Sequence, residues 1–185
     1  MAIDSLATFQ STFAALPLVE TGVWTTNFSD WLDARVTAKA EIAEVTHAVT
    51  PFTFDKATFK SELDKLGVTN SRLDGATAFA NAWRVAIDSS TFVTLAGDFV
   101  NPPPATSANT WSVVTSSIID TSSKDTAEAQ IITDIVNASN VLDPLNSDLP
   151  KILRDAFLNL TISITGLNSV APTPAPLNVS GASLL

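Results

Sequence analysis

The stretch of sequence that decides the fold is DLPKILRDAFLNLTISITGL, residues 148–167. Its first half predicts a helix, because Asp148 can cap the N-terminus, Pro150 suits the first turn, and apolar residues recur every three or four positions. Its second half fits two patterns. Residues 160–167 continue the helical spacing, yet they also alternate apolar and hydroxyl side chains as a half-buried strand does. We expect helix to about Asn159, and the remainder stays open between helix and strand.

Outside this stretch, helical periodicity extends over most of the chain. Apolar residues recur at helical spacing in further segments, several of which stop at proline or glycine or start at a capping residue. The expected helices are residues 3–16, 30–48 (capped by Ser29 after a linker), 55–66, 74–88, 106–119 and 125–142. Residues 36–46 also alternate apolar and polar side chains, and residues 91–100 resemble a short strand.

The chain is therefore expected to be mainly α. A multi-helix bundle with a minor extended/β element is predicted for residues 1–170, and an extended C-terminal arm for residues 171–185. At 185 residues, one domain is the simplest organisation, and a triple proline places a further boundary at 101–105. An α+β fold is the alternative if residues 36–46 and 160–167 form strands.

Side chains that perform covalent or acid–base chemistry are scarce. The chain has no Cys, no Tyr and one histidine, His47. The net charge of −9 disfavours nucleic acid and anionic membranes as partners, because both are bound through Lys and Arg. The first basic residue, Arg35, lies too far along for the basic start of a signal peptide. We expect a non-enzymatic, cytoplasmic protein that needs no cofactor and joins its assembly, in one version a virion, after synthesis.

One motif has the spacing of a metal site. Glu44 and His47 form the Glu-x-x-His pattern of di-metal helical bundles, and Glu41 precedes them by one turn. Such a site needs the motif twice, whereas this chain has one histidine. We therefore favour a solvent-facing helix surface, predict no metal site, and keep a metal-dependent enzyme using Glu44 and His47 as an alternative.

The C-terminal segment is the strongest candidate for contact with a partner. Residues 156–185 carry no charged side chain, and their end combines regularly spaced prolines with aliphatic residues. An extended, uncharged arm can lie in a groove of a neighbouring subunit or add a strand to a sheet edge, and a frayed terminus is the alternative. The arm residues predicted to contact a partner are Pro172, Pro174, Pro176, Leu177, Val179, Leu184 and Leu185.

Trp24 and Trp31 are two further candidate contacts. Tryptophan is enriched among residues that anchor interfaces. Packing within the monomer is the explanation that we favour for both, because tryptophan is highly buried on average.

These features predict a structural or assembly protein whose partners are copies of itself or other assembly subunits. Charged residues make up 16% of the chain, which leaves little electrostatic protection against association. The Ser-, Thr-, Ala- and Asn-rich composition, with PPP and PTPAP linkers, resembles that of tailed-phage virion proteins in general, without a motif that identifies a family. The most concrete version is a virion component in an outer, connector, tail or decoration position. The alternative is a monomeric helical module that binds a small apolar ligand or a peptide.

Overall fold

The structure, a computed structural model, describes residues 3–17, 23–36, 52–67, 69, 71–91, 98–99, 109–139, 148–168 and 175–183. The fold is mainly α with a minor β element, as the sequence predicts. The helices of these segments are α1 (Leu6–Ala14), α2 (Val23–Val36), α3 (Lys56–Asp64), α4 (Arg72–Ser89), α5 (Thr121–Asn137) and α6 (Leu149–Leu158). The strands are β1 (Asp98–Phe99), β2 (Asn109–Ile119), β3 (Thr161–Asn168) and β4 (Ala175–Ser183).

Helices α1 to α6 form a bundle that we call the helical unit. Each helix packs against the next one along the chain, and α6 closes the ring by packing against α1. Hydrogen bonds fasten both ends of the antiparallel pair α4 and α5. Arg72 at the start of α4 donates to the carbonyl oxygen of Ala138, which follows α5. Arg84 near the end of α4 donates to the carboxylate of Asp125 near the start of α5, at 2.6 Å.

Three helices begin where the sequence provides a capping side chain. Ser5, Asp55 and Ser71 precede α1, α3 and α4, and each side chain accepts a hydrogen bond from a backbone N–H of the first turn. These bonds satisfy donors that have no partner within the helix. Asp148 occupies the expected N-cap position of α6 without making such a bond, and Pro150 lies in the first turn as predicted.

Aromatic side chains fill the middle of the helical unit. Phe28 of α2 is fully buried and stacks on Trp24 and Trp31, with ring centroids 4.9 and 5.6 Å away. Phe157 of α6 meets Trp83 of α4 edge to face at 5.9 Å, and both rings are fully buried. Contacts of this second kind join helices that are distant in sequence into one core.

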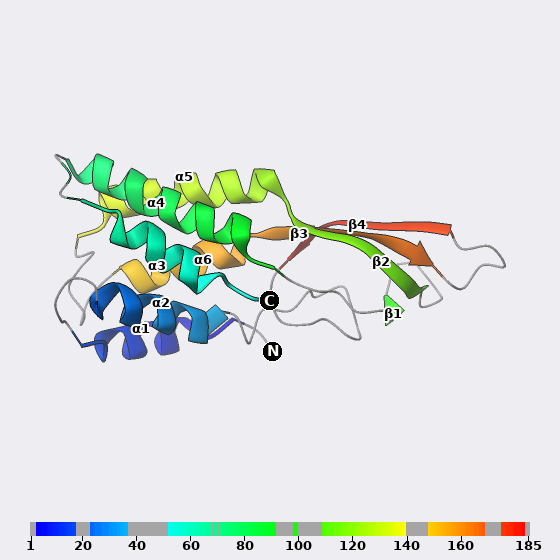
Figure 1. Cartoon of the computed structure of the whole chain (residues 1–185), viewed down its shortest axis with the longest axis horizontal. Helices are drawn as coiled ribbons and strands as arrows, with labels where there is room; N and C mark the ends of the chain where they lie inside the picture. The colour runs from blue at the N-terminus through cyan, green and yellow to red at the C-terminus, as the bar shows by residue number, and fades with distance from the viewer. Residues whose placement is uncertain are drawn as a thin grey trace.

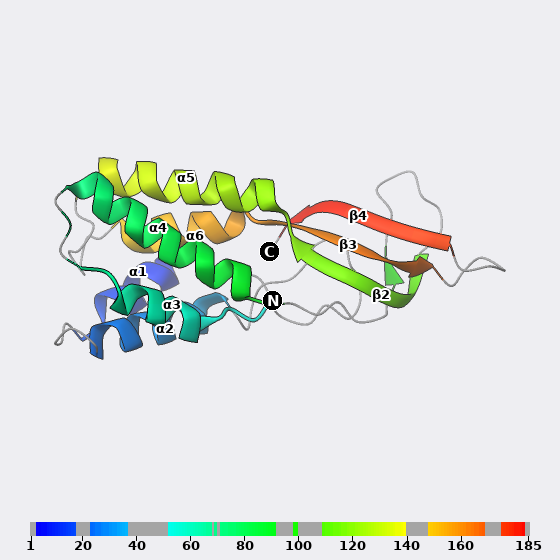
Figure 2. The ribbon, with the colours of Figure 1, turned by 45° about the horizontal axis from the view of Figure 1, so that its top comes forward.

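Strands β2, β3 and β4 form an antiparallel sheet that extends away from the helices in both views (Figure 1, Figure 2). We call these three strands the projecting sheet; β3 is the central one. The short strand β1 pairs with the far end of β2. Only Asp120 separates β2 from α5, and only Asn159 and Leu160 separate α6 from β3. The helical unit therefore occupies one end of an elongated molecule and the projecting sheet the other.

The prediction of a helix over residues 106–119 is wrong, because β2 occupies Asn109–Ile119. Trp111, Val114 and Ile118 do repeat at helical spacing, but the segment is rich in β-branched residues and pairs with β3. Over residues 160–167 the strand alternative is the correct one, since α6 ends at Leu158 and β3 follows.

Helix α2 begins earlier than predicted. It starts at Val23, so Ser29 is a buried residue inside the helix and does not cap it. The physical reason is the spacing of Trp24, Phe28 and Trp31, which lie on one face of a helix and pack together. The strand alternative for residues 36–46 falls outside the described residues apart from Val36, which ends α2.

The C-terminal arm is extended where the structure describes it. Residues 175–183 form β4, which pairs with β3 of the same chain. The division into residues 1–170 and 171–185 stays a prediction, and the boundary at 101–105 lies outside the described residues. Among the described helices, none combines the length and the apolar composition that crossing a bilayer requires.

Candidate functional site

A metal centre is the first chemistry that the sequence raises. Among the described residues, no three His, Cys, Asp or Glu side chains are grouped so that they could hold a metal ion. Glu41, Glu44 and His47 lie outside these residues, so the metal-dependent alternative stays a prediction.

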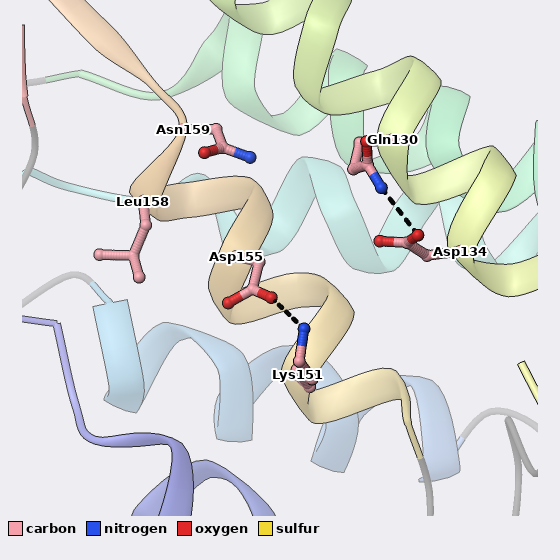
Figure 3. Close-up of a pocket in the computed structure, with 6 residues that line it drawn as sticks. All are labelled: Gln130, Asp134, Lys151, Asp155, Leu158 and Asn159. Carbon is pink, nitrogen blue, oxygen red and sulfur yellow. Dashed lines mark hydrogen bonds and ion pairs between the residues drawn. The ribbon is translucent and has the colours of Figure 1, made fainter.

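A groove between α5 and α6, lined by described residues, has a volume of about 360 Å³. Four of its polar side chains form two pairs (Figure 3). Gln130 donates to Asp134 at 2.7 Å, and Lys151 donates to Asp155 at 2.6 Å, which raises the pKa of Lys151. Each pair joins two residues of the same helix, the first in α5 and the second in α6. The groove thus has a mostly polar lining, with Leu158 as its apolar member, and does not suit an apolar ligand.

A network of charged residues holds α5 against α4. Arg84 donates to Asp88 at 3.1 Å and to Asp125 at 2.6 Å, and Lys124 donates to Asp88 at 2.5 Å. Burial raises the pKa of Asp88, but the hydrogen bonds from Lys124 and Arg84 outweigh it and hold the pKa below its ordinary value. This network fixes the first turns of α5, and therefore the point where β2 leaves the helical unit.

Asp120 ties the projecting sheet to the helical unit. Its carboxylate accepts hydrogen bonds from the hydroxyls of Thr161 and Ser163 in β3, at 2.7 and 2.6 Å. Its backbone N–H donates to the carbonyl oxygen of Thr161 at 2.8 Å. The hydroxyl of Ser123 in α5 donates to the carbonyl of Asp120 and accepts from the N–H of Thr161. We call these four residues the junction.

The carboxylate of Asp120 forms hydrogen bonds with β3 and none with the backbone of α5. Asp120 occupies the N-cap position of α5 but makes no side-chain capping bond. A negative charge there still interacts favourably with the positive end of the helix dipole. The junction therefore uses one side chain to set the direction in which β3 leaves the helical unit.

The projecting sheet carries no charged side chain. Strands β2, β3 and β4 have 11, 8 and 9 residues, and none is Asp, Glu, Lys, Arg or His. The helical unit, in contrast, bears surface ion pairs such as Lys56 with Asp30 and Lys60 with Asp64. Strands without charge lack a common protection against pairing with other chains. The projecting sheet is therefore the best candidate for a functional surface in the described part of the chain.

Three of the predicted arm contacts lie in β4. Pro176, Leu177 and Val179 are in register with Leu167, Gly166 and Ile164 of β3, respectively. The other predicted arm residues lie outside the described residues: Pro172, Pro174, Leu184 and Leu185. The structure thus brings part of the arm into the candidate surface.

Trp24 and Trp31 lie in the helical unit, apart from the projecting sheet. Trp31 is 5% exposed, and its indole N–H donates to the hydroxyl of Thr12 at 2.9 Å. Trp24 is half-buried and stacks on Phe28. Packing within the chain therefore accounts for most of the surface of Trp31, and a partner contact for either residue stays a prediction.

The sequence did not point to β2 as part of the candidate surface, and it placed β3 in the uncharged stretch 156–185 without naming its residues as contacts. The signal was present, since residues 109–119 and 161–168 are both uncharged and rich in β-branched and hydroxyl residues. What hid it was the helical spacing of their large apolar residues.

Comparison with protein-family models, with curated proteins and with solved structures finds no match.

Removing the carboxylate of Asp120 should loosen the sheet at the junction. In Asp120→Ala, two hydrogen bonds to a charged acceptor are lost, which should cost about 1.5–3 kcal/mol. Amide exchange of residues 161–164 should accelerate about tenfold or more, while α1 to α3 keep their exchange rates. Ser122→Ala, at an exposed neighbouring position, is the control. Unchanged exchange in Asp120→Ala would show that the junction does not hold β3.

The α4–α5 network should make stability depend on pH. The pKa of Asp88 is lower in the folded chain, so its contribution is present above the unfolded pKa of about 4 and is lost as the pH falls below it. Asp88→Asn should lower the free energy of unfolding by about 1 kcal/mol or less at pH 7, because the side chain is 46% exposed. Urea unfolding of both chains should show that this difference in the free energy of unfolding is smaller below pH 4 than at pH 7. An equal difference at the two pH values would contradict a lowered pKa of Asp88.

Proposed function

We propose that this protein is a non-enzymatic structural subunit that joins a larger assembly through the projecting sheet. The observation that carries the proposal is the uncharged composition of β2, β3 and β4, which extend beyond the helical unit (Figure 1). Antiparallel sheets that face water usually present polar and charged side chains there. A sheet that projects from its own domain without charge is better explained by a partner that covers it.

The proposed partners are copies of this chain or other assembly subunits. An uncharged surface offers no Lys or Arg to phosphates, and the chain has a net charge of −9, so nucleic acid and anionic membranes are not among them. The assembly that the composition favours is a viral particle of the tailed-phage type. The acidic balance suits an outer, connector, tail or decoration position, because a surface that lines a genome needs basic residues.

The geometry of the helical unit supports the proposal that this unit positions the projecting sheet. Its core is closed by aromatic contacts, and its ion pairs run within and between its own helices. The junction then sets the direction of the sheet. We infer that the helical unit holds the projecting sheet in place and that the sheet makes the contact.

The mass of the chain in solution tests this proposal. By light scattering after size exclusion, over a concentration series, the intact chain should exceed its monomer mass of 19.5 kDa. Val179→Lys, which introduces a charge into β4, should shift the mass toward that of the monomer. Leu73→Lys, at a helical position that is 55% exposed, should leave the mass unchanged. A monomer at every concentration would contradict self-association.

A further inference from the structure

We draw no further inference here: the strongest candidate, the groove between α5 and α6 where the carboxylates of Asp134 and Asp155 lie near Lys151, carries none, because two acids paired within their own helices do not define a ligand and nothing in the described part of the chain shows what would occupy the groove.

Discussion

The structure depends on one fixed point, the hydrogen-bonded junction between Asp120 and the start of β3. Strand β2 passes into α5 and α6 passes into β3 at this place, with one or two residues between the elements. Because the carboxylate of Asp120 holds Thr161 and Ser163, the two strands leave the helical unit side by side. The ion pairs of Arg84 and Lys124 keep α5, and with it Asp120, in place. The direction of the whole sheet follows from these contacts.

The helical unit carries charged side chains, and the three strands of the projecting sheet carry none. The helical unit contains a closed aromatic core and an outer layer of acids and bases that pair with each other. The projecting sheet has a face that begins in that core and no charged residue on its three main strands. A monomer would gain solubility from charges on such a sheet, so their absence is a cost that contact with a partner would offset.

Local sequence predicted most of the described helices but missed the start of α2 and the whole of β2. Apolar periodicity predicted helices over residues 3–16, 55–66 and 74–88, where α1, α3 and α4 lie, because that signal acts within a few residues. Strand β2 was predicted as helix because Trp111, Val114 and Ile118 satisfy the helical period. Its true state depends on pairing with β3, about fifty residues away, which no local pattern encodes.

The candidate surface was predictable only in part, because composition can be read locally and strand pairing cannot. The uncharged composition after Asp155 indicated a contact segment, and β4 contains Pro176, Leu177 and Val179. Composition could not indicate that this segment pairs with its own chain, or that β2 belongs to the same surface. A strand finds its neighbour by register and shape, and an arm that could add to another subunit's sheet can equally add to its own.

Hydrogen exchange of the intact chain at low and high protein concentration tests the central claim most directly, because it needs no substitution. If the projecting sheet joins a second copy, amides in β2, β3 and β4 exchange more slowly at high concentration, while those of α1 to α4 keep their rates. Exchange that does not depend on concentration, or slowing confined to the helical unit, would contradict the account.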